Sequence, residues 1–450
     1  MTDTDQYDPQ VADVYIHHLA EVSEKNEVIA REDIVSEFGV LLVAKGVAIG
    51  KKTARLLSNH RLSKPVDDFV KLSKPLSNSS LLNEFEETFQ SSSDLNSIYD
   101  ENRASELLRH LFLSRNFPHP LLQKLAVLKE KYPTVYQRSL FGALFGSLIA
   151  REMGWSTEGV HDVFVASIFQ DLGMLHIPEG VVLKEAGFDK DQWRAMQSHV
   201  VVSSIIVESL GFYSDSVHSG IREHHERPDG LGYPKRLTEN KLGSTGKIIA
   251  LSDLIYRIRG RSSESDNSVS IESSMPYLRM NNRPVNQTIH AAIKLIKRGE
   301  ISRIHAHTNS DIQQLAKIIV SRGDAIYNIY LKNLCLLSLL NNLVLEKTGL
   351  AMKNLVELAD YTFVTTGFDF ENIYEEIGSF TYSELKDIDE TQIEYLWIIK
   401  RIQQSSVFFI ENSVDRTLPI SGFIVGRLER IFSLLAKQSM KVFEPSYSID

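Results

Sequence analysis

The sequence predicts a mainly α-helical protein, with a small mixed α+β module at the amino terminus and a helical region at the carboxyl terminus. Apolar residues recur at helical spacing from Ala104 onward. Residues 137–153 are apolar on nearly all sides, which is typical of a buried central helix. Residues 325–437 again show strong apolar faces at helical spacing.

Length and composition indicate a globular chain of two or three domains. The 450 residues exceed the size at which one core is usual. The formal net charge of −9 gives no reason to expect nucleic-acid binding. The single cysteine, Cys335, excludes an intrachain disulfide and a cysteine metal cluster. We expect no membrane span and a cytoplasmic protein, because the most apolar run (residues 334–345) is too short and no export signal is visible.

The small amino-terminal module is expected over residues 11–72. Short apolar runs on both sides of Lys45-Gly46 predict a β-hairpin, and residues 51–62 show the periodicity of an amphipathic helix. Residues 73–100 are rich in serine and have little periodicity, so we interpret them as a linker.

The central helical domain is expected over residues 101–322, and residues 323–450 form the carboxy-terminal helical region. A polar insertion rich in serine and glutamate interrupts the central domain at about residues 262–282. One predicted helix of this domain, residues 160–170, ends directly before Asp171-Leu172-Gly173.

The stretch from His224 to Pro234 carries the candidate chemistry. Two adjacent histidines and Glu226 stand at the predicted end of a helix, and turn-forming residues follow them. Neutral imidazole and carboxylate groups suit a borderline transition metal such as iron, manganese or zinc. Neighbouring helical residues point about 100° apart, so either His224 and His225 serve different neighbours or only one is a ligand. The alternative, a surface histidine pair beside an ordinary turn, does not explain the whole string.

This stretch matches the HHE…DG-x-GYP signature at every fixed position, and the chain resembles the HD-GYP branch of the HD phosphohydrolase superfamily up to about residue 322. The best-known members of that family hydrolyse cyclic di-GMP in bacteria. The resemblance implies an HD-type helical domain, a role in cyclic di-GMP signalling, and a divalent transition metal, iron or manganese, as cofactor.

The resemblance also implies the metal ligands, which are Asp171, His199, His224, His225 and Asp253. In active relatives two ions share the aspartate of the HD pair, which falls on Asp171 here. The second ion would use Asp171, His199 and His224, with His225 nearby or serving a third ion.

Three positions depart from the family pattern. Arg138 and Gln170 stand where the family has histidines, and Met174 stands where it has a lysine. Gln170 offers only an amide oxygen and Arg138 has no lone pair, so we expect one bound ion or none. We hypothesise that the Arg138 guanidinium bridges Asp171 and Asp253 in place of the missing ion. The alternative is that Arg138 turns to solvent and the site has decayed.

We therefore predict impaired or absent phosphodiesterase activity and a regulatory role in binding nucleotide or protein. An active metal-dependent phosphodiesterase and a non-catalytic scaffold are the alternatives. The resemblance implies cyclic di-GMP as ligand, diguanylate cyclase domains as partners of the GYP loop, and a contact surface made by Asp229, Gly230, Gly232, Tyr233, Pro234 and Arg283. A helical tail of this size also suggests a homodimer.

Overall fold

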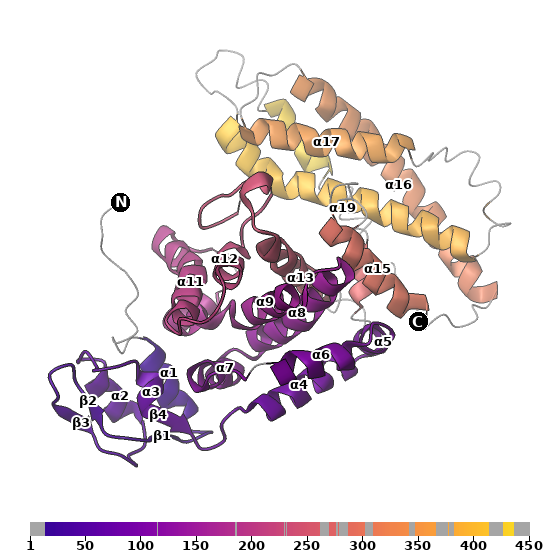
Figure 1. Cartoon of the computed structure of the whole chain (residues 1–450). Helices are drawn as coiled ribbons and strands as arrows, with labels where there is room; N and C mark the ends of the chain where they lie inside the picture. The colour runs from indigo at the N-terminus through magenta and orange to yellow at the C-terminus, as the bar shows by residue number, and fades with distance from the viewer. Residues whose placement is uncertain are drawn as a thin grey trace. The chain divides into compact units, whose positions relative to one another are not determined.

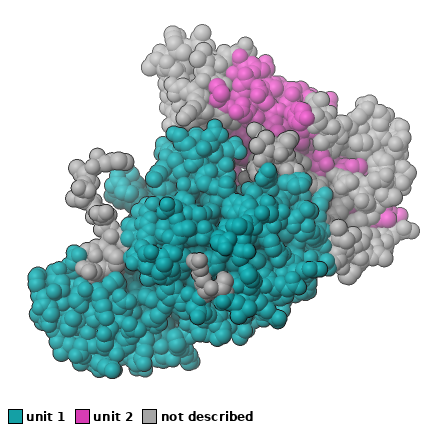
Figure 2. Space-filling view, in the orientation of Figure 1, with its two compact units in different colours: residues 1–261, 270–272, 287–303 teal, residues 262–269, 273–286, 304–450 magenta. Residues whose placement is uncertain are grey.

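The computed structural model describes residues 14–114, 116–184, 187–228, 230, 232–261, 270–275, 278, 287–301, 309–341, 347–365, 377, 382–413 and 426–435. The described chain is mainly helical, as the sequence predicts (Figure 1). It divides into two compact units, each described by itself below (Figure 2). Unit 1 comprises residues 1–261, 270–272 and 287–303, and unit 2 comprises residues 262–269, 273–286 and 304–450.

The amino-terminal module is part of unit 1. Its elements are α1 (Val14–Val22), β1 (Val28–Ala30), β2 (Ile34–Val35), β3 (Leu41–Val43), α2 (Lys51–Leu57), α3 (Val66–Phe69) and β4 (Val70–Leu72). Strand β1 pairs antiparallel with β4, and β2 pairs antiparallel with β3. The hairpin predicted at Lys45-Gly46 is wrong: β3 pairs with β2, while Ile49 N–H donates to Val28 O on β1 at 2.7 Å. An apolar run predicts a strand but does not predict which other strand pairs with it.

The remaining elements of unit 1 form a helical core. They are α4 (Asn78–Gln90), α5 (Ser93–Glu101), α6 (Ala104–Ser114), α7 (His119–Lys131), α8 (Pro133–Glu152), α9 (Thr157–Phe169), η1 (Leu172–His176), α10 (Glu179–Val182), α11 (Lys190–Glu208), α12 (Asp215–Glu223), η2 (Glu239–Lys241), α13 (Ser244–Arg261), the first half of η4 (Ile271–Ser274) and α15 (Gln287–Ile301). Helix α8 is buried over most of its length, which confirms the predicted central helix. It packs against α9 and α13 (Figure 1).

Residues 73–100, predicted to be a linker, instead form helices α4 and α5. The Ser77 hydroxyl caps the first turn of α4. Leu81, Phe85 and Phe89 recur every four residues and are fully buried. Serine favours turns, but it is also a preferred N-cap residue, so the serines that suggested a linker mark helix starts here.

A buried ion pair fixes α5 to α13. Arg259 donates to the Asp94 carboxylate through Nε (2.8 Å to Oδ2) and Nη2 (3.1 Å to Oδ1). Ile271 N–H donates to the same carboxylate at 2.8 Å. Burial raises the pKa of Asp94, but hydrogen bonds from Arg259 and Ser92 more than offset this effect, and the pKa lies below its ordinary value.

The substitution Asp94→Ala is expected to destabilise the fold by about 3–5 kcal/mol, because it leaves a buried guanidinium without its partner. Since the pKa of Asp94 is lowered in the folded state, its contribution is present at neutral pH and is lost in acid as the carboxylate takes up a proton. Urea unfolding of wild type and variant from neutral to acidic pH measures both effects. Glu24→Gln, at an exposed ion pair with Lys51, is the control. A constant difference between wild type and Asp94→Ala at every pH would contradict the prediction.

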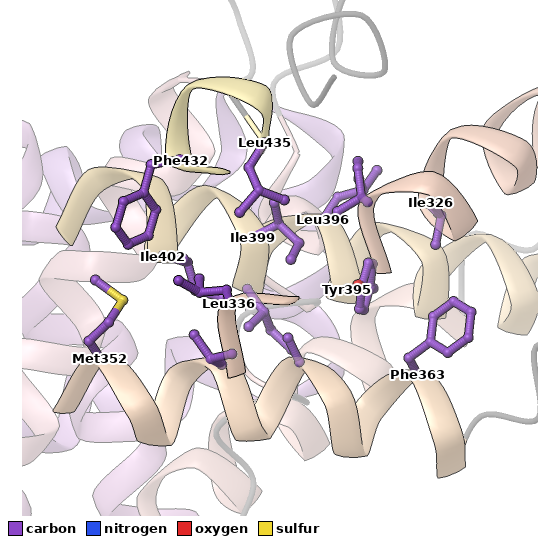
Figure 3. Packing of buried hydrophobic residues seen from close by; sticks show 14 of the residues in the cluster. Ile326, Leu336, Met352, Phe363, Tyr395, Leu396, Ile399, Ile402, Phe432 and Leu435 are labelled. Carbon is purple, nitrogen blue, oxygen red and sulfur yellow. The ribbon is translucent and has the colours of Figure 1, made fainter. Parts of the chain in front are cut away.

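Unit 2 is a helical bundle. It contains α16 (Asn309–Asn341), α17 (Lys347–Thr365), α19 (Tyr382–Ser413) and a further helix at residues 426–435. Its buried side chains, among them Leu336, Met352, Ile399 and Phe432, come from all four helices (Figure 3). The boundary predicted at residue 322 is wrong, because it falls inside the continuous helix α16. Apolar periodicity predicts the helix but not the unit against which it packs.

Candidate metal centre

Asp171 is fully buried at the junction where α9 ends and η1 begins. The turn after it packs directly on α11: a Cβ atom on Gly173 would lie 2.2 Å from the carbonyl oxygen of His199, so no side chain fits there. Gly173 N–H donates to Ser203 Oγ at 2.7 Å. The Ser203 hydroxyl thus joins the turn that carries Asp171 to the helix that carries His199.

Three imidazoles converge on Asp171. One ligand atom from each of Asp171, His199, His224 and His225 lies within 4.8 Å of the others. His224 is the C-cap of α12 and keeps a helical backbone, yet the His224 and His225 rings both lie in this cluster, with centroids 4.1 Å apart. Whether one or both of them are ligands stays a prediction.

Hydrogen bonds to the backbone orient two of these rings. Nδ1 of His199 lies 2.5 Å from Met196 O, and Nδ1 of His224 lies 2.7 Å from Ile221 O. A carbonyl oxygen only accepts, so each Nδ1 carries a proton, and in the neutral ring Nε2 is the atom with the free lone pair. The two Nε2 atoms are 3.4 Å apart, and they lie 3.5 and 3.7 Å from Asp171 Oδ1. Three electron-pair donors therefore face one another, an arrangement that a bound cation stabilises.

The charge states of these groups are those that metal ligands need. Burial lowers the pKa of His199 to about 4, although the Asp171 carboxylate opposes this shift. Burial and the two neighbouring imidazoles also hold the pKa of His225 well below its usual range. Burial raises the pKa of Asp171, but Arg138, His224 and His199 outweigh it and keep that pKa well below the ordinary value. Neutral imidazoles at His199 and His225 beside an ionised carboxylate suit a divalent metal ion.

The opposite face of Asp171 contacts an arginine. Arg138 Nη2 lies 2.7 Å from Asp171 Oδ2, and Arg138 Nε lies 3.0 Å from Asp253 Oδ1. The Arg138 side chain is 16% exposed, so it occupies the bridging position between the carboxylates and does not turn to solvent. Burial opposes the charge on Arg138, but the two carboxylates raise its pKa above the ordinary value.

The residues around Arg138 do not fit a second ion. The guanidinium takes one oxygen of Asp171 and one of Asp253, and Arg257 Nη2 lies 2.9 Å from the other Asp253 oxygen. The Gln170 side chain is buried, and its oxygen accepts no hydrogen bond. Asp253 was predicted to be a metal ligand. In the contacts described here, it is linked to Asp171 of the histidine cluster through Arg138.

The loop after the histidines folds back on them. Glu226 is buried, and its carboxylate accepts hydrogen bonds from Lys235 N–H (2.5 Å) and Leu237 N–H (2.8 Å). A Cβ atom on Gly232 would lie 2.4 Å from Arg227 N, so glycine permits this close approach. Among the predicted contact residues, Gly230 has a left-handed φ of 72°, and Pro234 is exposed after a cis peptide bond. Asp229 and Arg283 lie outside the described residues.

Tyr233 lies against the histidines. Its ring centroid is 4.8 Å from that of His225 and 5.5 Å from that of Trp193. Burial, with the negative charges of Asp171 and Asp253 nearby, raises the pKa of its hydroxyl above the usual range. The Tyr233 ring therefore contributes to the wall of the metal centre, and the neighbouring residues Pro234, Lys235 and Arg236 form the exposed part of the loop.

Two residues of the site were not identified from the sequence. Arg257 follows Asp253 by four residues on α13, a spacing that places their side chains together and could have indicated the ion pair. Trp193 comes from the start of α11, and its contact with Tyr233 joins residues forty positions apart, for which the sequence holds no local signal.

Part of the chain that contains this cluster is similar to known proteins. Residues 120–283 match the model of the HD domain family. Over 132 residues the chain is 26% identical to 3'3'-cGAMP-specific phosphodiesterase 1 of Vibrio cholerae, covering 29% of this chain and 30% of that protein. Over 106 residues it is 31% identical to a cyclic di-GMP phosphodiesterase of Thermotoga maritima, covering 23% of this chain and 29% of the relative.

A solved structure of Bd1817, a HDG"Y"P protein from Bdellovibrio bacteriovorus, matches 60% of this chain and 94% of its own at a TM-score of 0.32 and 11% identity, values too low to support a comparison of folds. Among the described helices, none has a stretch both long and apolar enough to cross a membrane.

Residues 120–283, which carry the histidine-aspartate cluster, therefore belong to the class of HD domains. Within that class, the GYP loop and the cyclic-dinucleotide phosphodiesterase relatives show that the chain carries an HD-GYP family domain. The matched segments span only 30% and 29% of the length of these curated relatives.

Proposed function

We propose that this chain is a regulatory HD-GYP protein of cyclic dinucleotide signalling, with impaired or no phosphodiesterase activity. In this proposal it holds one divalent transition ion and acts by binding a nucleotide or a protein. The observation that carries the proposal is the contact of Arg138 with both Asp171 and Asp253. Family members with full activity would place histidine-ligated metal at this position.

Asp171, His199 and His224, with His225 beside them, would hold the ion, and iron or manganese suits their mixed nitrogen and oxygen donors. An ion bound there supplies a Lewis acid that polarises a phosphate oxygen and lowers the pKa of coordinated water. Arg138 and Arg257 balance the charges of Asp171 and Asp253, so a divalent ion would leave the site with a net positive charge, which favours an anionic ligand. Met174 offers no proton donor or positive charge. These residues therefore support phosphate binding better than phosphodiester cleavage.

The ligand class follows from the relatives and from the loop. Both relatives described above are named as phosphodiesterases of cyclic dinucleotides, which supports a ligand of that class. Trp193 is 43% exposed beside Tyr233, and an exposed aromatic face suits stacking with a nucleobase. The exposed residues Pro234, Lys235 and Arg236 are the surface that we propose for a protein partner such as a diguanylate cyclase domain.

Metal analysis tests the first part of the proposal. Protein loaded with Mn²⁺ and freed of excess metal is expected to retain one ion per chain. His224→Ala is expected to weaken Mn²⁺ binding by roughly tenfold or more, because it removes a donor from the cluster. His60→Ala, at an exposed histidine of the amino-terminal module, is the matched control and should bind Mn²⁺ as wild type does. Equal binding by wild type and His224→Ala would refute the assignment of the site.

A titration with cyclic di-GMP, followed by product analysis on the same samples, tests the second part. The proposal expects saturable binding with little or no linear dinucleotide formed. Two ions per chain with brisk hydrolysis would identify an active phosphodiesterase instead. If the protein binds neither Mn²⁺ nor cyclic di-GMP, the proposal is refuted in favour of a non-catalytic scaffold.

A further inference from the structure

Besides the hydrogen bond between Gly173 and Ser203, polar contacts at three points hold the segment that begins at Asp171. Asp171 itself lies in the histidine cluster. His176, the last residue of η1, contacts the Lys124 ammonium of α7, with Nε2 and Nζ 3.3 Å apart. Glu179, the first residue of α10, forms an ion pair with Lys131 of α7 at 2.8 Å. Two of the three anchors of this segment therefore depend on lysines of α7.

Lys124 is buried in a cluster built largely by the amino-terminal module. Its Nζ atom lies 2.8 Å from Asp67 Oδ2 and 3.6 Å from the ring centroid of Tyr15. The side chains of Lys124 and Asp67 are 5% and 4% exposed. The other Asp67 oxygen accepts from the Tyr15 hydroxyl at 2.5 Å and from Gln123 Nε2 at 3.0 Å. An ammonium only donates, so His176 Nε2 accepts from Lys124.

This cluster joins α1 and α3 of the module to the turn that begins at Asp171. Asp67 belongs to α3 and Tyr15 belongs to α1. The ring centroid of Tyr15 is also 5.3 Å from that of His176. On its other side, η1 rests on the α11 backbone at Gly173, with no room for a methyl group. The turn is thus held between the module and the helix that carries His199, so a shift of His176 would be transmitted to Asp171.

We infer that Lys124, held by Asp67 of the amino-terminal module, is a positioning residue for the metal centre. This inference rests on the proposed function, because it assigns Asp171 to a metal site. Docking of the module fixes η1, and η1 sets the place of the Asp171 carboxylate between the imidazoles and Arg138. Loss of the Lys124 contacts therefore loosens the turn and weakens ion binding without removing a ligand.

The test uses the full chain with the double substitution Asp67→Asn/Lys124→Met. Asparagine keeps an oxygen that accepts from Tyr15 and Gln123, methionine keeps the bulk of the lysine, and no lone charge is left buried. The control is the double substitution Glu24→Gln/Lys51→Met, which removes an exposed ion pair of the same module. Circular dichroism and thermal melting of metal-free samples establish that both variants are folded.

Two measurements decide the inference. In metal-free protein, amide hydrogen exchange of residues 172–177 is expected to be about tenfold faster in the Asp67→Asn/Lys124→Met variant, with α8 and α9 unchanged. Mn²⁺ is expected to bind the same variant about tenfold more weakly with unchanged stoichiometry. Values like those of wild type in both measurements would overturn the inference, and so would faster exchange throughout unit 1, which indicates a merely structural role. If wild type binds no Mn²⁺, the proposed function fails, and the exchange measurement still decides whether Lys124 positions the turn.

Discussion

Replacing Arg138 and Gln170 together by histidine is expected to raise the metal content from one ion to two per chain. The double substitution removes the guanidinium that takes an oxygen from both Asp171 and Asp253, and it adds two imidazoles beside them. A site with two imidazoles and two carboxylates meets the donor preferences of iron or manganese. Hydrolysis of cyclic di-GMP should become measurable, although Met174 still lacks the lysine of the family pattern.

Metal content after loading with Mn²⁺ and product formation from cyclic di-GMP measure these two effects. Gln170→His alone is the matched control, because Arg138 remains between the carboxylates and should still exclude a second ion. A double variant that keeps one ion per chain would show that Arg138 is not what prevents the second ion from binding.

The substitution Arg138→Met is expected to destabilise the metal-free protein by about 3–5 kcal/mol, because it leaves two buried carboxylates without their shared counter-charge. Arg257 still contacts Asp253, but no arginine then contacts Asp171. Addition of Mn²⁺ should recover more stability in Arg138→Met than in wild type, since a cation can enter the space that the guanidinium leaves.

Urea unfolding with and without Mn²⁺ measures this difference. Arg257→Met is the matched control: its side chain is 47% exposed, and its loss is expected to cost about 1 kcal/mol or less. If Arg138→Met were as stable as wild type without metal, Arg138 would not be holding the carboxylates together.

The residues of the cluster were predicted through the family resemblance, which rests on short motifs of the sequence. The helix that ends at Asp171 and the histidine pair after α12 are both visible as short patterns, and the structure brings Asp171, His199, His224 and His225 together. The bridging contact of Arg138 with Asp171 and Asp253 also agrees with the hypothesis drawn from the family resemblance and from the charge of arginine. That these groups bind metal stays a prediction.

Other features depended on tertiary contacts and could not be predicted. The close approach of the His224 and His225 rings, with centroids 4.1 Å apart, was not expected from the helical angle between neighbouring residues. The cluster of Lys124, Asp67 and Tyr15 joins elements more than fifty residues apart, and no periodicity indicates it. The polar insertion predicted at residues 262–282 lies mostly outside the described residues, and the proposed homodimer stays a prediction.

Arg138 has a consequence for how the protein withstands metal starvation. A cation that is part of the polypeptide cannot be extracted by a chelator, displaced by zinc or oxidised like a paired iron centre. The charges of Asp171 and Asp253 are therefore balanced by Arg138 and Arg257 from the moment the chain folds, whatever the iron supply of the cell.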